Sequence, residues 1–142
     1  HRWAGGEEDA AAIFTALADT GIDYIHTTEY RALAPAFDDT VRSLAELAKR
    51  YSGLSIIANG HLDDPRDAAT IVDSGAADIV ALAKAALANR DWPRRVRMGQ
   101  PLSPDVPADL FGPVATVKDW EVTDVPNIAG LEGRDYKTVD TT

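Results

Sequence analysis

Two apolar runs in the chain end on residues that could hold an anion. The run LSIIA is followed by Asn59 and Gly60, and the run ADIVAL is followed by Ala83 and Lys84. A glycine lets a ligand approach the backbone, small alanines keep the next loop open, and a lysine supplies positive charge. A lysine at the start of a helix opposes the helix dipole, which favours an anion placed between the two.

Each of these residues also has an ordinary explanation. Gly60 is consistent with a tight turn and Lys84 with a surface lysine, and either residue alone would favour that simpler interpretation. Their positions after consecutive strands change the balance, because the last two strand-to-helix loops of parallel α/β barrels often bind phosphate. We therefore predict that Asn59, Gly60, Ala83 and Lys84 together bind a phosphate group.

Other polar residues near the strand ends are weaker candidates. His26 ends the preceding strand and is expected at the edge of the core, although it could donate a hydrogen bond to a ligand. Tyr30 and Arg31 follow in a loop from which they could reach a ligand. For His61 the sequence favours neither a bystander nor a ligand contact, and Asp64 is expected to cap the next helix. The sequence shows no metal triad and no Ser-His-Asp set.

Helical and extended patterns alternate along most of the chain. The predicted helices cover residues 7–20, 39–51, 65–74 and 83–89, and a further helix is predicted to follow its cap at Asp91. The predicted strands cover residues 22–27, 54–58 and 77–82. Val41 is expected in the apolar stripe of the second helix. Because each linker holds a helix, neighbouring strands are expected to be parallel, with both faces of the sheet covered.

This pattern predicts an α/β fold, the second half of a TIM (β/α)8 barrel. A closed barrel needs eight strands and about 250 residues. We assign residues 1–98 to the barrel and the proline-rich residues 99–142 to an irregular C-terminal extension. The chain starts at His1 rather than at a methionine, so we expect a fragment. Its open sheet edges would pair with a missing N-terminal half of the barrel or with a second copy in a homo-oligomer.

Composition argues against several partners. The net charge of −9 and the pI near 4.6 oppose nucleic acid as the main partner. The arginines between Arg90 and Arg97 are expected to form a solvated helix face. No run of about 18 apolar residues is present, so we expect no membrane-spanning helix. Cysteine is absent, which excludes disulfides and thiolate metal sites, and we expect a cytoplasmic protein.

The stretches GIDYIHTTEY and IIANGHLDDPRDAATIVDSGAADIVALAKAALANRDWPRRV resemble the old yellow enzyme family of NADH:flavin oxidoreductases. The family pattern is a strand ending in glycine, a helix ending in G-x-A-D-x-V, and then a Gly-Arg pair before an N-P-type turn. The residues that fit this pattern are Gly60, Pro65, Ala68, Gly75, Ala77, Asp78, Val80, Leu87, Asn89, Trp92 and Pro93. The tail LFGPVATVKDWE is also similar to tails in this family.

The resemblance implies a barrel that binds FMN noncovalently and takes hydride from NAD(P)H. It implies that Gly60 and its neighbours, with Ala83 and Lys84, hold the FMN phosphate, and that Arg2 contacts the flavin ring. It also implies an ene-reductase activity on a small-molecule substrate, an α,β-unsaturated carbonyl compound.

The chain departs from the family in two ways. Ala83 and Lys84 stand where the family has Gly-Arg, and a lysine lacks the two-pronged grip of an arginine on phosphate. The family's substrate-binding histidine pair and proton-donating tyrosine belong to the first half of the barrel, so no catalytic residue is assigned here. Two alternatives stay open. One is a non-flavin barrel enzyme that binds a phosphorylated metabolite, and the other is a non-catalytic half-barrel that serves as an interaction module.

Overall fold

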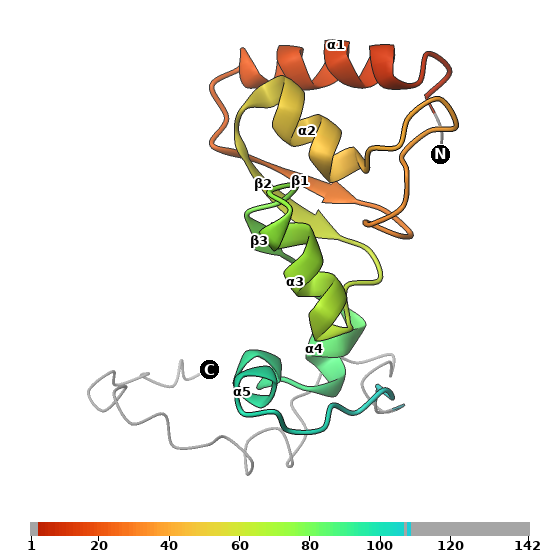
Figure 1. The fold of residues 1–142 in the computed structure, drawn as a ribbon. Helices are drawn as coiled ribbons and strands as arrows, with labels where there is room; N and C mark the ends of the chain where they lie inside the picture. Colours follow the sequence, from red (N-terminus) through yellow and green to blue (C-terminus); the bar gives the residue numbers. More distant parts are fainter. Residues whose placement is uncertain (1–2, 107, 109–142) are drawn as a thin grey trace, which may run out of the picture. The chain divides into compact units, whose positions relative to one another are not determined.

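The computed structural model describes residues 3–106 and residue 108, and residues 3–106 belong to one compact unit. Helices and strands alternate in chain order (Figure 1). The elements are α1 (Glu7–Ala18), β1 (Tyr24–Thr28), α2 (Leu44–Ser52), β2 (Ser55–Asn59), α3 (Pro65–Asp73), β3 (Ile79–Val80), α4 (Lys84–Ala88) and α5 (Trp92–Arg97). The extension predicted over residues 99–142 falls mostly outside the described residues, and its boundary stays a prediction.

The three strands form one parallel sheet in the order β1-β2-β3. Ile25 of β1 pairs with Ile56 of β2, and Ala58 of β2 pairs with Val80 of β3. This confirms the prediction of parallel strands joined by helical crossovers. Because parallel strands end at the same edge, the loops after β1, β2 and β3 meet on one side of the sheet.

Helices cover only one face of this sheet. Figure 1 shows α2 lying along β1 and β2, with α1 stacked on α2. Ile25 and Ile56 on the covered face are buried, whereas Tyr24 is 56% exposed and Ile79 is 53% exposed. The prediction that both faces are covered is therefore wrong for the described residues. In a closed barrel the second face points inward and is filled by side chains from the other strands.

The core contains an aromatic cluster that fixes the first helix. The ring of Trp3 lies 5.9 Å from that of Phe14 on α1 and 5.8 Å from that of Phe37 in the loop before α2, measured between centroids. The side chains of Leu47 on α2 and Ile71 on α3 are fully buried. Burial of such side chains is the main source of stability for the layer.

The second helix begins later than predicted. Ser43 caps it by accepting a hydrogen bond from the Glu46 amide at 3.2 Å, so the helix starts at Leu44 and not at residue 39. Val41, expected in the apolar stripe, is 89% exposed in the preceding loop. The Ala36 amide donates to the Arg42 carbonyl at 2.8 Å, and this closed loop competes with an earlier helix start.

Three further elements test the sequence prediction. Asp64 caps α3 by accepting from the Arg66 amide at 2.8 Å, as predicted. The third strand is only two residues long instead of six. Asp91 precedes α5 but makes no side-chain cap, because its carboxylate pairs with Arg95 Nε at 2.7 Å.

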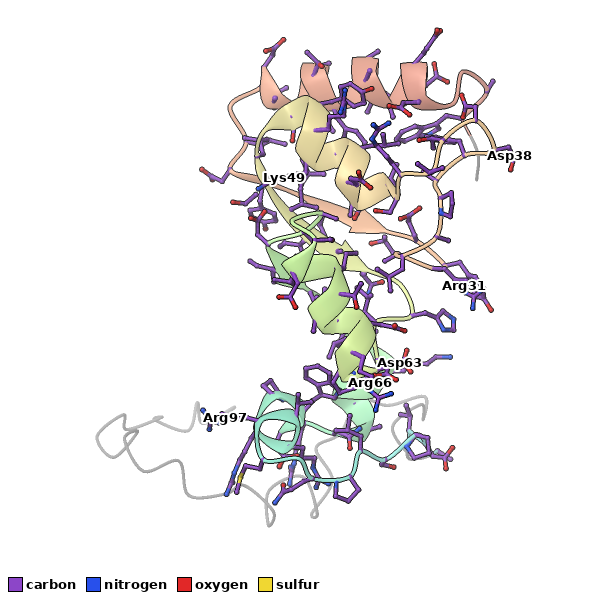
Figure 2. The ribbon with its side chains drawn as sticks, in the orientation of Figure 1. Arg31, Asp38, Lys49, Asp63, Arg66 and Arg97 are labelled. Carbon is purple, nitrogen blue, oxygen red and sulfur yellow. The ribbon has the colours of Figure 1, made fainter. Side chains whose placement is uncertain are left out.

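Polar contacts at the amino ends of the strands stabilise the sheet. Lys49 at the end of α2 (Figure 2) donates to Asp78 at 2.8 Å, and Asp78 also accepts from the Ile56 amide at 2.7 Å. These bonds, the Lys49 ammonium first, lower the pKa of the Asp78 carboxyl. The same residue thus links α2, β2 and the start of β3, on the side of a barrel where structural contacts are expected.

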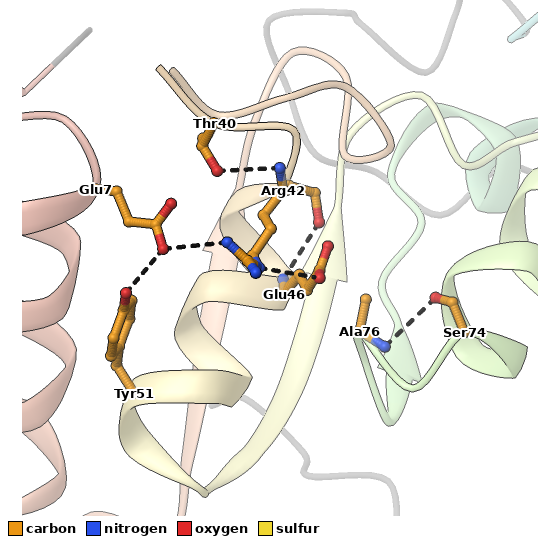
Figure 3. Close-up of polar contacts among 8 residues, drawn as sticks. Glu7, Thr40, Arg42, Glu46, Tyr51, Ser74 and Ala76 are labelled. Carbon is orange, nitrogen blue, oxygen red and sulfur yellow. Dashed lines mark hydrogen bonds and ion pairs between the residues drawn. The ribbon is translucent and has the colours of Figure 1, made fainter. Parts of the chain in front are cut away.

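A second polar network joins α1 to α2 (Figure 3). Glu7 accepts from the Tyr51 hydroxyl at 2.8 Å and from Arg42 Nη1 at 3.4 Å. The Tyr51 bond is the main cause of the lowered pKa of Glu7. Arg42, in the loop before α2, also pairs with Glu46 on α2 at 3.5 Å. These contacts fix the relative position of two helices and lie away from the strand ends that carry the candidate site.

Candidate cofactor site

A groove of about 720 Å³ lies at the carboxyl ends of the strands. Its walls come from the ends of β1, β2 and β3, from α4 and Trp92, and from residues 102–104. Asn59, Gly60, Ala83 and Lys84, predicted from the sequence to act together, all line it. The structure therefore brings these four residues into one cavity, although whether they bind a phosphate stays a prediction. Arg2 lies outside the described residues.

Gly60 is required by the backbone of the neighbouring loop. Its φ angle is 138°, and a Cβ at this position would collide with the carbonyl oxygen of Glu29. The loop is held by two backbone bonds, from the Glu29 amide to the Asn59 carbonyl and from the Ala32 amide to the Gly60 carbonyl, both 3.0 Å long. The sequence suggested that a glycine is needed here so that a ligand can approach the backbone. In the structure, it is the loop after β1, at Glu29, that lies too close to Gly60 for a side chain.

Asn59 connects the two loops whose residues are predicted to bind a phosphate group. Its side-chain Nδ2 donates to the carbonyl of Ala81 at 2.8 Å. Ala81 follows β3 and precedes Ala83 and Lys84, so this bond holds the end of β2 next to the loop after β3. Asn59 therefore sets the spacing of the groove walls, whatever contact it makes with a ligand.

Lys84 places a positive charge at the mouth of the groove. It is exposed at the start of α4, and within the described part of the chain its ammonium has no ion-pair or hydrogen-bond partner. Ala83 before it is exposed and adds only a methyl group. An unpaired cation beside small residues is the donor set that an incoming phosphate group requires.

An aromatic pair forms one rim of the groove. The rings of Tyr30 and His61 meet edge to face with centroids 4.8 Å apart, and Tyr30 is 80% exposed. His61 has a positive φ of 48°, which is uncommon outside glycine. His61, for which the sequence left the roles of bystander and ligand contact equally open, lines the groove, and whether it contacts a ligand stays a prediction. Arg31 extends away from this loop (Figure 2) and does not line the groove.

Glu29 is a groove residue that the sequence did not single out. Burial raises the pKa of its carboxyl to about 7, and a hydrogen bond from the Leu44 backbone opposes this shift. Its Oε2 atom is buried and has no hydrogen-bond partner among the described residues. The Nε1 atom of Trp92, another lining residue, is also buried and unpaired. A carboxyl directly after an apolar strand was the only sequence signal for Glu29.

Two classes of site find no support in the described residues. No group of three or more His, Asp or Glu side chains there could hold a metal ion. No helix there is long and apolar enough to cross a membrane. The groove combines small residues with the carboxyl groups of Glu29, Asp63 and Asp64, and Lys84 is the one lysine or arginine among its described lining residues.

A family model for the NADH:flavin oxidoreductase / NADH oxidase family matches residues 8–103. The chain belongs to this family. Its relationship to old yellow enzymes, first indicated by the residue pattern, is thereby confirmed. A search of curated proteins found no match.

Solved structures of this family share the fold. Morphinone reductase in complex with tetrahydroNAD is 28% identical with a TM-score of 0.60, over 84% of this chain and 30% of that chain. A second morphinone reductase structure is 28% identical with a TM-score of 0.59, over 90% of this chain and 33% of that chain. An old yellow enzyme homologue from Zymomonas mobilis, at 21% identity and a TM-score of 0.58 over 82% of this chain and 31% of that chain, shows the fold alone.

The chain spans about a third of the length of these structures. Its three parallel strands and their helices are part of a TIM barrel, as the sequence predicted. The bare face of the sheet follows from this, because the strands that would fill the barrel interior are not among the described residues. The activity of a complete barrel is a proposal and not a property of the described unit.

Proposed function

We propose that this chain supplies the phosphate-binding side of the FMN site in an ene-reductase-type NAD(P)H oxidoreductase. The observation that carries the proposal is the groove in which Asn59, Gly60, Ala83 and Lys84 come together at the carboxyl ends of parallel strands. In parallel α/β folds this edge of the sheet is where ligands bind. Family membership favours a flavin phosphate over the phosphate of another metabolite.

The residues present fit a phosphate group. Lys84 offers a free ammonium, and Gly60 and Ala83 leave room beside it. Asn59, bonded to Ala81, keeps the two loops at a fixed spacing. A lysine acts on phosphate as a single point charge and an arginine as a fork, so the grip here rests on fewer hydrogen bonds than in relatives with Gly-Arg.

FMN, when bound, would accept a hydride and pass it on. The proposed donor is NAD(P)H and the proposed acceptor is an α,β-unsaturated carbonyl compound. The protein's part on this side of the site is to bind and orient the phosphate end of the cofactor. Arg2 is proposed to contact the flavin ring. A cytoplasmic location and pairing with an N-terminal half-barrel or with a second copy also stay predictions.

The test is flavin binding by the complete gene product, with a variant at Lys84. We expect Lys84→Ala to raise the Kd for FMN by about 10- to 100-fold, the range for losing one charge-assisted contact. Riboflavin lacks the phosphate, so its Kd should stay within about twofold in the same variant. Lys84→Arg is the matched control, because it keeps the charge and should keep the affinity for FMN.

Two results would remove Lys84 from the site. One is an unchanged Kd for FMN in Lys84→Ala, and the other is an equal loss of riboflavin and FMN affinity, which would indicate general damage to the groove. Fluorescence quenching of free flavin during titration gives both constants in one format.

A further inference from the structure

One wall of the groove is made by a segment that has no regular structure of its own. Residues 101–106 form neither helix nor strand, yet Leu102, Ser103 and Pro104 all line the groove. A segment without backbone ladder bonds keeps its place only where other groups hold it. The contacts that hold this wall therefore decide whether the groove is formed.

Asn89 makes the main contacts with this segment. It is the residue between α4 and α5, and it is only 3% exposed. Its Nδ2 donates to the Ser103 carbonyl at 2.9 Å, and its Oδ1 accepts from the Ser103 amide at 2.8 Å. Nδ2 also donates to the Ala85 carbonyl of α4 at 3.2 Å. One buried side chain thus pairs with both backbone groups of Ser103, as a neighbouring strand would.

This double contact needs an amide side chain. Asparagine carries one acceptor oxygen and a nitrogen with two hydrogens, and all three functions are used here. An aspartate would keep the bond from the Ser103 amide but would place a carboxylate oxygen against the two carbonyls. An alanine would leave buried backbone groups of Ser103 without partners.

A weaker second contact holds the start of the segment. Arg95 Nη1 donates to the Pro101 carbonyl at 3.2 Å, and its Nε is fixed by Asp91 at 2.7 Å. The Arg95 side chain is partly exposed, whereas Asn89 is buried. Because a hydrogen bond is stronger in a buried environment, Asn89 contributes more than Arg95 to holding residues 101–106 in place.

We propose that Asn89 is a positioning residue for the cofactor groove. By clamping Ser103, it holds residues 102–104 as one wall of the groove, and ligand affinity depends on that clamp. The ligand part of this inference rests on the proposed FMN site. The clamp itself does not, and it can be measured without any flavin.

The experiment compares three variants of the complete gene product by hydrogen exchange and by FMN titration. In Asn89→Ala we expect the Ser103 amide, which loses its bond to Asn89 Oδ1, to exchange at least about tenfold faster, while amides of α1 and β2 keep their protection. The Kd for FMN should rise about tenfold, which corresponds to the loss of roughly one net hydrogen bond. Asn89→Asp keeps the bond from the Ser103 amide but places a carboxylate against two carbonyls, so it should also raise the Kd for FMN.

Ser74→Ala is the matched control. Ser74 makes two side-chain bonds, to the Ile71 carbonyl at 3.0 Å and from the Ala76 amide at 3.4 Å (Figure 3), and it does not line the groove. Because Ser74 is exposed, this variant should cost less stability than Asn89→Ala, and it should leave both the Ser103 exchange and the FMN Kd unchanged.

The possible failures are distinguishable. Unchanged exchange of the Ser103 amide in Asn89→Ala would refute the clamp. Faster exchange with an FMN Kd within twofold of wild type would refute the link to the groove. Absence of FMN binding by the wild type would refute the proposed function, while the exchange data would still decide on the clamp. If Asn89→Ala does not fold, Asn89→Asp decides the same questions.

Discussion

Glu29 gives the sharpest prediction about the groove, because its Oε2 atom is buried and has no hydrogen-bond partner among the described residues. Burial raises its pKa from the ordinary 4.5 to about 7. The folded protein therefore holds a proton there at pH values where the unfolded chain has released it. By linkage, the stability associated with this group is fully present below about pH 4.5 and is lost as pH rises through 7.

The size of the effect follows from the shift. A pKa change from 4.5 to about 7 corresponds to an upper limit of about 3 to 4 kcal/mol at one site. Glu29 lies at the groove and is only partly buried, so water screens part of this, and we expect about 1–2 kcal/mol. Glu29→Gln resembles the protonated side chain and does not titrate. The free energy of unfolding of wild type minus that of Glu29→Gln should therefore fall by about 1–2 kcal/mol between pH 4.5 and 8.

Urea unfolding of both proteins at several pH values across this range measures the difference directly. The other ionisable groups are present in both proteins, so the difference between the two free energies of unfolding removes their contributions. Glu7, Asp78 and Asp91 have pKa values lowered mainly by Tyr51, Lys49 and Arg95. The stability that comes from these lowered pKa values is lost as pH falls, at the acid end of the range, and not as pH rises through 7. Parallel pH profiles for the two proteins would refute the assignment of a buried, protonated Glu29.

Two further predictions concern the backbone, and both are checked by urea unfolding. Gly60→Ala should cost about 3 kcal/mol or more, because of its φ of 138° and the collision with the Glu29 carbonyl, whereas Gly75→Ala, with a φ of 76° and open space around it, should cost about 1 kcal/mol. Equal costs would show that the loop after β1 does not press on Gly60. Ser43→Ala should cost about 1 kcal/mol through loss of the α2 cap, and Val41→Ala should change stability by less than about 0.5 kcal/mol. A large effect at Val41 would mean that the helix starts earlier than Leu44.

Local signals were enough to predict the elements that carry their own start and stop residues. Asp64 and Pro65 mark the start of α3 within two positions, and the structure places both as expected. The start of α2 was predicted too early because Val41 has the right spacing from Leu44 to extend the apolar stripe. The bond between the Ala36 amide and the Arg42 carbonyl, which no periodicity reveals, fixes the chain there as a loop.

Some residues of the candidate site could likewise be predicted from local signals, and others could not. Asn59, Gly60, Ala83 and Lys84 directly follow strands, so the rule that ligands bind at strand ends was enough to group them. Glu29 and Asn89 were not grouped with them, because their importance comes from contacts made by tertiary packing. Asn89 meets Ser103 fourteen positions later in the chain, and the residues between them carry no motif that announces this pairing.

Family membership and groove geometry together make flavin content the most direct test of the account. The complete gene product, purified without added cofactor and then incubated with FMN, should bind it with a stoichiometry near one per chain and show the flavin absorbance bands. The flavin released by heat should be identified by mass as FMN and not riboflavin. A protein that is folded by circular dichroism yet binds no FMN, or binds riboflavin equally well, would contradict the assignment of this groove to the FMN phosphate.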